Sequence, residues 1–240
     1  MRLLALETST EACSVALWLD GEVRERFQVA PRRHAELVLP WADALLAEAG
    51  IARASLDGIA VSRGPGAFTG VRLGISLAQG IALALDLPAL AVSTLAVLAQ
   101  GARVPEAGLA DTRVLAAIDA RMGEVYLGGF ARVGDGWRAL VPEAVVAPDA
   151  ATLPGDATDG GWIGVGTGFA ALDGALRTRL GARLGVVDDA ALPRAGDLAR
   201  MAAAAFARGE AVAPDLLEPA YLRNNVALTV AEQAASRQRD

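Results

Sequence analysis

Three hydroxyl side chains and one carboxylate stand together near the start of the chain, and a glycine-rich stretch follows. Glu7 ends a short apolar segment, and Thr8, Ser9 and Thr10 come directly after it. The stretch SRGPGAFTGVRLGIS, residues 62–76, carries four glycines and runs into an apolar segment of helical pattern. Backbone N–H groups at a helix N-terminus bind phosphate. These residues indicate an anion-binding turn, or else a turn whose hydroxyl groups bind only their own backbone.

The glycine spacing argues against both common nucleotide loops. Gly64, Gly66 and Gly70 are one residue too far apart for the dinucleotide pattern G-x-G-x-x-G, and Pro65 lies between the first two. A Walker A loop needs a lysine, and the 22 basic residues are all arginine. We expect the glycines chiefly to shape a strand-to-helix turn, with a positive φ at Gly64 or Gly66. An anion at the helix N-terminus is the alternative.

The second half of the chain repeats this arrangement. Residues 115–119, LAAID, resemble residues 3–7, LLALE, because each is a short apolar segment that ends in a carboxylate before a turn. VGTG at residues 165–168 follows an apolar segment, as the first glycine stretch does. The repeat indicates a duplicated fold with a cleft between its halves, although two ordinary turn acids are the alternative. The cleft candidates are Glu7, Thr8, Ser9, Gly64, Gly66, Asp119, Gly166 and Gly168.

Other reactive residues are few. His34 and Cys13 are the single histidine and the single cysteine, so no Cys and His cluster can form a zinc site. We interpret His34, beside Arg32 and Arg33 at a helix start, as a surface or interface residue, and Cys13 as a small core residue. Without lysine there is no Schiff-base nucleophile. No cofactor is predicted, and weak binding of ATP or ADP in the cleft is left open.

The composition is that of a folded chain without a strongly basic character. The 240 residues are 53% hydrophobic and carry a net charge of −6, whereas proteins that bind nucleic-acid backbones are usually basic. The densest basic patch, Arg24 to His34, is interpreted as a solvated surface. Polar residues interrupt the apolar region 73–98, which favours a buried helix and strand over a membrane span. A single cysteine and the lack of an apolar leader before Glu7 predict a cytoplasmic protein.

Periodicity and turn signals predict alternating strands and helices. Asp20-Gly21 predicts a hairpin, and apolar residues at helical spacing predict helices over residues 33–49 and 71–85. Ser93 or Thr94 is the expected N-cap of a third helix. This alternation is typical of an α/β fold with two similar lobes. The other expected elements are strands at 3–6, 14–19, 58–62 and 89–92, strand–turn–strand units within 113–140, and helices at 170–180, 196–208 and 228–237.

Five segments together carry a family resemblance: LLALETSTEACSVAL, HAELVLPWADALLAEAG, GIAVSRGPGAFTGVRLGISLAQGIA, IDARMGEVY and PAYLRN. They resemble the bacterial TsaB (YeaZ) family, a subunit of the machinery that makes threonylcarbamoyladenosine in tRNA. The resemblance is dense in the first half and thin over residues 135–200. It implies an actin-like (ASKHA, ribonuclease H-like) fold of two lobes. These are an N-terminal lobe of residues 1–103, completed by residues 210–240, and a C-terminal lobe of residues 104–209.

The resemblance implies a subunit without chemistry of its own. The family is related to the catalytic TsaD subunit, in which a paired-histidine metal motif follows the strand after the glycine helix. The matching segment here is VSTLAVLAQG, residues 92–101, and it contains no histidine. Without such ligands a catalytic iron or zinc cannot be held there. The implied role is a scaffold or activating subunit of the complex that transfers threonylcarbamoyl to the adenosine next to the tRNA anticodon.

The resemblance also implies the partners. TsaB pairs with TsaD through helices of the N-terminal lobe and supports recruitment of a small ATPase, TsaE, while tRNA is reached only through the complex. Helices 33–49 and 71–85 suit this role, because small residues along one side of the second helix admit a close neighbour. The alternative is that this side packs on the chain's own sheet. A homodimer through the same helices is expected when the chain is alone. The interface candidates are His34, Leu37, Trp41, Gly70, Arg72, Gly74 and Ala78.

Two other functions are compatible with the fold. An ATP-dependent small-molecule kinase would use Glu7 and Asp119 to manage magnesium, and it requires tight binding of Mg–ATP by the isolated chain. A metalloprotease would require metal ligands, which the sequence does not supply.

Overall fold

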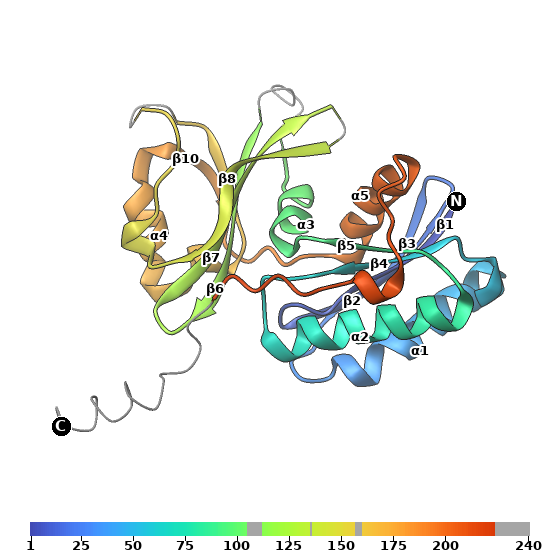
Figure 1. The fold of residues 1–240 in the computed structure, drawn as a ribbon. Helices are drawn as coiled ribbons and strands as arrows, with labels where there is room; N and C mark the ends of the chain where they lie inside the picture. Colours follow the sequence, from blue (N-terminus) through green and yellow to red (C-terminus); the bar gives the residue numbers. More distant parts are fainter. Residues whose placement is uncertain (105–111, 135, 157–159, 224–240) are drawn as a thin grey trace, which may run out of the picture.

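The computed structural model describes residues 1–104, 112–134, 136–156 and 160–223. Within these residues two five-stranded sheets lie next to each other, each covered by helices (Figure 1). Strands and helices alternate along the chain, as the sequence predicts. The helix predicted at 228–237 lies outside the described residues.

The first sheet has the strand order β3-β2-β1-β4-β5. Strands β1, β2 and β3 are antiparallel neighbours, whereas β4 runs parallel to β1 and β5 parallel to β4. The predicted hairpin at Asp20-Gly21 is confirmed, since both residues have a positive φ, of 47° and 110°. The strands are β1 (Arg2–Glu7), β2 (Ala12–Leu19), β3 (Glu22–Val29), β4 (Gly58–Ser62) and β5 (Ala89–Val92).

The second sheet repeats this topology. Its order is β10-β9-β6-β7-β8. Read from β8, these are the third, second, first, fourth and fifth strands of the second half, which is the order of the first sheet. The duplication of the fold is therefore confirmed, and two such units form the actin-like fold. The strand β10 was not predicted, although its sequence LGVVD contains three apolar residues; most of its residues are exposed in the structure. The strands are β6 (Arg113–Arg121), β7 (Glu124–Val133), β8 (Gly136–Val146), β9 (Trp162–Val165) and β10 (Leu184–Asp188).

Helices cover both faces of the first sheet. Side chains alternate along β1, so Leu4 and Leu6 pack under α1 and α2 while Leu3 and Ala5 pack under α5. Figure 1 shows α1 and α2 below this sheet and α5 above it. The helix α1 continues through Pro40. The helices are α1 (His34–Ala49), α2 (Phe68–Leu85), α3 (Thr94–Gln100), α4 (Ala171–Leu180) and α5 (Ala195–Ala207), with 3-10 turns at Arg53–Ser55, Pro148–Ala150, Thr167–Phe169, Gly181–Arg183 and Pro214–Leu216.

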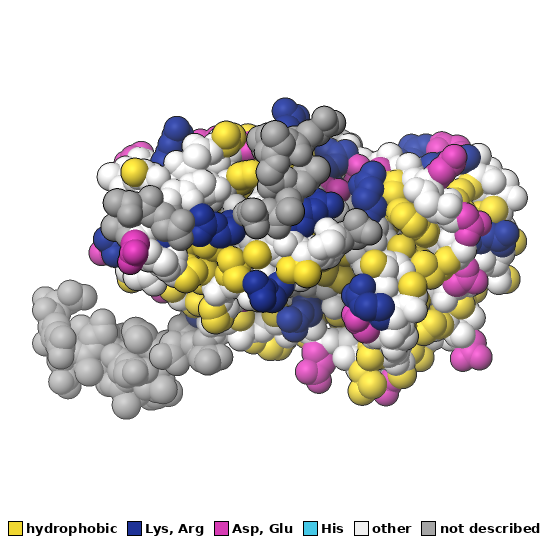
Figure 2. Space-filling view, turned by 90° about the horizontal axis from the view of Figure 1, so that it is seen from above, with side chains coloured by type: hydrophobic (Ala, Val, Ile, Leu, Met, Phe, Trp, Pro, Cys, Tyr) yellow, Lys and Arg dark blue, Asp and Glu magenta, His cyan; other side chains and the backbone are white. Residues whose placement is uncertain are grey.

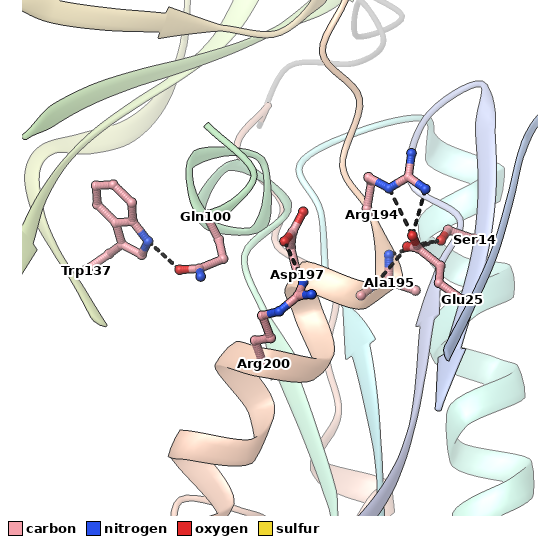
Figure 3. Close-up of polar contacts among 9 residues, drawn as sticks. Ser14, Glu25, Gln100, Trp137, Arg194, Ala195, Asp197 and Arg200 are labelled. Atoms are coloured by element: carbon pink, nitrogen blue, oxygen red, sulfur yellow. Dashed lines mark hydrogen bonds and ion pairs between the residues drawn. The ribbon is translucent and has the colours of Figure 1, made fainter. Parts of the chain in front are cut away.

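The short helix α3 lies between the two sheets. It contacts β6, β7 and α5, and its side chains belong to a core cluster shared with the second sheet. Ser93 is its N-cap, because the Ser93 hydroxyl accepts hydrogen bonds from Leu95 N and Ala96 N. Trp137 Nε1 donates a 2.6 Å hydrogen bond to Gln100 Oε1 (Figure 3). The helix thus joins the two halves of the molecule.

The helix α5 packs on the first sheet, whereas the predicted boundary at residue 209 assigned it to the second lobe. Its N-terminus is held by distant residues (Figure 3). Ser14 Oγ accepts from Ala195 N at 3.0 Å and donates to Glu25 Oε1 at 2.8 Å, and Arg194 donates to Glu25 Oε2 at 2.7 and 2.9 Å. These bonds cap the helix and complement its positive end. The lobe boundaries themselves stay a prediction.

Arginine side chains lie over the middle of the molecule on the face seen from above (Figure 2). On the α5 side, Arg194 and Arg200 each have a carboxylate partner, Glu25 and Asp197. Their charge is therefore largely compensated within the chain.

One described helix, α2, is long and apolar enough to cross a membrane by length and composition alone. A core helix passes the same test, and the inner face of α2 packs on the first sheet. The rest of the chain covers its outer side less completely.

Candidate functional site

The first turn is buried. Glu7, Thr8 and Ser9 are at most 1% exposed. Ser9 donates to Glu7 Oε1 from its backbone N at 2.7 Å and also from its hydroxyl. Thr94 Oγ1 donates to Ser9 Oγ at 3.1 Å and accepts from Gly64 N at 3.1 Å. Apart from Glu7 Oε2, these side-chain groups therefore bind one another.

The glycines let the loop and α2 approach this turn closely. Ala67 N donates to Ser9 O at 2.7 Å, and Thr8 Oγ1 donates to Gly70 O at 2.7 Å. A Cβ atom on Gly66 would lie 2.2 Å from Ser9 O, and one on Gly70 would lie 2.1 Å from Thr8 O. The expected positive φ is confirmed at Gly64, where it is 93°. The stretch thus acts as a close-packing turn.

The second half repeats this close packing around Asp119. A Cβ atom on Gly166 would lie 2.2 Å from Ala117 O, and Gly168 also lies against Ala117. Asp119 N donates to Thr167 Oγ1 at 3.3 Å, and the Asp119 carboxylate pairs with Arg121 at 2.8 Å. Within the described ranges no hydrogen bond or ion pair links Asp119 to Glu7. The cleft candidates therefore form two separate turns, one around Glu7 and one around Asp119.

The carboxyl group of Glu7 has an unusual environment. Burial raises its pKa from 4.5, and the neighbouring Ser62 hydroxyl and the hydrogen bonds from Ser9 lower it by less. Although Ser62 Oγ is near enough to act on this pKa, neither Ser62 Oγ nor Glu7 Oε2 completes a hydrogen bond of normal geometry. A carboxylate without exposed surface has no access to magnesium in solvent. This burial removes the main support for the kinase alternative.

Replacing Glu7 by glutamine is expected to stabilise the fold by about 1 kcal/mol at pH 7. The amide oxygen still accepts from Ser9, and the new NH₂ group can donate to Ser62 Oγ. Because the folded pKa of Glu7 is raised, the native state binds the proton more tightly than the unfolded state. The wild-type chain therefore loses stability as the pH rises above about 4.5 towards the folded pKa, and the variant lacks this loss. Urea unfolding between pH 4.5 and 8 measures the effect.

The exposed Glu11 of the same turn provides the matched control. The Glu11→Gln variant should unfold like the wild type over the same pH range. A Glu7→Gln variant that is less stable at pH 7 would contradict this account of the buried carboxyl group.

Three interface candidates face the interior, which corrects their assignment to a partner surface. His34 is 8% exposed, and its Nε2 lies 3.0 Å from Ala12 O. Gly74 and Ala78 are buried against the chain's own sheet, and a Cβ atom on Gly74 would lie 2.5 Å from Thr8 Oγ1. Thr8 fills the space beside Gly70 in the same way. The small-residue side of α2 therefore packs inward, as the alternative interpretation proposed.

The remaining interface candidates are partly exposed. Leu37 and Trp41 are half-buried against the core under α1. The Arg72 guanidinium lies 3.3 Å from the centre of the Phe68 ring and donates to Tyr221 Oη at 2.7 Å.

The arginines of the basic patch at residues 24–34 lie on β3 and in the turn before α1. Arg24 NH1 donates to Glu48 O at 2.9 Å, and Arg26 forms an ion pair with Glu48. These contacts tie β3 to α1.

An apolar groove of about 430 Å³ lies between the outer sides of α1 and α2. Leu39 and Leu46 line it from α1, and Leu77, Gly80 and Ile81 line it from α2. Leu39 is 45% exposed. These residues are not among the predicted interface residues, because the prediction rests on the stripe of α2 that faces the sheet. The signal was a second apolar stripe, which includes Leu77, Ile81 and Ala84.

Other chemistry finds little support in the described residues. They contain no group of three or more His, Cys, Asp and Glu side chains placed to hold a metal ion. Cys13 is buried, and burial raises the pKa of its thiol to about 12, so it is not a nucleophile at neutral pH. This matches its predicted place in the core.

Comparison with known proteins gives consistent matches. A family model described as "TsaD: tRNA N6-adenosine threonylcarbamoyltransferase" matches residues 28–230. The chain is 45% identical to the tRNA threonylcarbamoyladenosine biosynthesis protein TsaB of Escherichia coli, over 95% of this chain and 96% of that protein. It is 39% identical to the Haemophilus influenzae protein of the same description, over 94% and 95%. The solved structure "YeaZ from Pseudomonas aeruginosa" is 48% identical, with a TM-score of 0.82 over 92% of this chain and 99% of that one.

Proposed function

The chain belongs to the TsaB (YeaZ) family of tRNA threonylcarbamoyladenosine biosynthesis proteins, and we propose that it is the non-catalytic scaffold of the complex that performs the threonylcarbamoyl transfer. In this role it binds a TsaD-type paralogue and activates it. The paralogue supplies the metal and the transfer chemistry, and this chain supplies a docking surface.

The apolar groove between α1 and α2 is the observation that carries the proposal. Its walls are mostly aliphatic, with Ser76 and the ion pair between Asp43 and Arg53 among the lining residues, although both helices lie at the surface. Apolar surface that is left open on a folded domain favours association with a partner. A helix of the paralogue would cover Leu39, Leu77 and Ile81 and remove them from water. The groove therefore replaces the buried glycine stripe as the proposed partner face.

The residues favour a scaffold over an enzyme. Residues 92–101, which correspond to the metal-binding segment of the catalytic relatives, contain no histidine. The hydroxyl groups of Thr8 and Ser9 make their hydrogen bonds within the chain. The other parts of the proposal are that the complex also recruits a TsaE-type ATPase, that tRNA is reached through the complex, that the isolated chain forms a homodimer through the groove, and that all of this takes place in the cytoplasm.

Co-purification tests the proposal. The chain is co-expressed with the TsaD-type paralogue from the same cell and analysed by size-exclusion chromatography with light scattering. We expect a stable complex, and we expect transfer of threonylcarbamoyl to tRNA only when both subunits are present. A chain that stays apart from the paralogue, or that is dispensable for the transfer, would overturn it.

A further inference from the structure

A set of aromatic, arginine and methionine side chains, most of them exposed, lies on both sides of the junction of the two halves. It is made by Phe68, Arg72, Tyr221, Met122 and Arg121, which we call the ridge. Phe68 is 64% exposed, Tyr221 58% and Met122 78%. These three side chains come from α2, from the segment after the 3-10 turn Pro214–Leu216, and from the turn between β6 and β7.

Contacts between residues that are far apart in the sequence hold the ridge together. The Arg72 guanidinium lies over the Phe68 ring and 5.0 Å from the centre of the Tyr221 ring. Ala220 N donates to Arg63 O at 2.8 Å and fixes the segment that carries Tyr221. Two residues further on, Arg223 donates to Ala120 O at 3.3 Å and to Glu124 Oε2 at 2.5 Å. In Figure 1 this segment is the red line that runs from the 3-10 turn to the second sheet.

The turn between β6 and β7 presents its side chains in a strained backbone. Arg121 and Met122 have φ values of 62° and 56°, a region that L side chains rarely adopt. The strain holds Arg121, whose side chain is 84% exposed, next to the exposed Met122. Arg223 NH1 also approaches Met122 Sδ at 3.4 Å. Strain of this kind is often retained where a turn serves binding.

From this geometry we infer that the ridge contacts unpaired nucleotides of the RNA that the complex modifies. Bases stack on the open faces of Phe68 and Tyr221 and pack on Met122, and Arg121 contacts a backbone phosphate. Alternating aromatic and cationic side chains are the usual surface for single-stranded nucleic acid. The inference rests on the proposed function, which supplies the RNA.

Charge favours RNA over a second protein as the occupant. The ridge and the residues that hold it contain four arginines, Arg63, Arg72, Arg121 and Arg223, against two carboxylates. Asp119 and Glu124 pair with Arg121 and Arg223, so Arg63 and Arg72 are the arginines of this set without a carboxylate partner among the described residues. The whole chain has a net charge of −6, so this surface is cationic against an acidic background. None of its residues is among those that line the groove. A partner bound in the groove therefore leaves the ridge free for RNA.

The test measures binding of the complete two-subunit complex to an unmodified tRNA anticodon stem-loop. The stem-loop carries 2-aminopurine in its loop, because the fluorescence of this base changes when it stacks on an aromatic ring. Phe68→Ala and Tyr221→Ala should each weaken binding about tenfold and reduce the fluorescence change. Tyr221→Phe keeps the ring and should bind normally. Arg121→Ala should reduce the salt dependence by about one phosphate contact.

Leu216→Ala is the matched control, since Leu216 is 63% exposed, is apolar and lies off the ridge. Paralogue binding is measured separately for every variant, so failure of the complex is distinguished from failure of the ridge. Unchanged RNA affinity of the alanine variants in an intact complex would overturn the inference. So would loss of paralogue binding with Phe68→Ala, because the ridge would then be a protein interface.

Discussion

Replacing Gly80 by arginine is expected to weaken binding to the TsaD-type paralogue by at least about thirtyfold, the effect of losing a hot spot of about 2 kcal/mol. Gly80 lines the groove between α1 and α2, and nothing lies within 4 Å of the position of its Cβ atom. The arginine side chain can therefore enter the groove without disturbing the fold. It puts a charge where the proposed partner helix would pack, and that charge would be buried without a partner.

The same variant should remain as stable as the wild type. Arginine is a better helix former than glycine by about 1 kcal/mol, and Gly80 has ordinary helical geometry. Isothermal titration calorimetry measures the affinity, and circular dichroism measures thermal unfolding. Ala204→Arg provides the control, because Ala204 is an exposed small residue of α5, far from the groove in the fold. If Gly80→Arg binds the paralogue with wild-type affinity, the groove is not the interface.

The elements of the first half could be predicted from local signals. The Asp20-Gly21 hairpin depends on two residues whose backbone preferences are strong. The predicted strand at 58–62 has the bounds of β4, because an unbroken apolar segment stands between turn residues. The topology of the second half could be predicted from its likeness to the first, except for β10. That strand is only five residues long and lies at a sheet edge, where its exposed side chains show no alternation of buried and exposed residues.

The orientation of the candidate residues could not be predicted in the same way. Gly70, Gly74 and Ala78 recur at helical spacing, and such a stripe fits a neighbouring helix as well as a neighbouring strand. The stripe faces inward because it packs against Thr8, which is 62 residues before Gly70 in the sequence. The ridge could not be predicted from the sequence for a related reason. Arg72 and Tyr221 are 149 residues apart, and no periodicity connects them.

Two glycines of α2 allow the inward packing to be tested within one helix. A Cβ atom on Gly70 would lie 2.1 Å from Thr8 O, and the oxygen belongs to a buried backbone that has little freedom to move. We expect Gly70→Ala to lower the free energy of unfolding by about 3 kcal/mol, the upper end of ordinary overpacking costs. For a chain of this size the unfolding temperature should fall by about 6–12 °C.

The Gly80→Ala variant makes the same chemical change and should have the opposite effect. Its Cβ atom meets nothing within 4 Å, so only the helix propensity changes, and stability should rise by about 1 kcal/mol. Denaturant unfolding of both variants gives the comparison directly. Because the intrinsic gain from glycine to alanine applies at both positions, the difference between them isolates the contact with Thr8. Equal stability of the two variants would mean that the loop and α2 do not press on the first turn, and the glycines would then again be available for an anion or a partner.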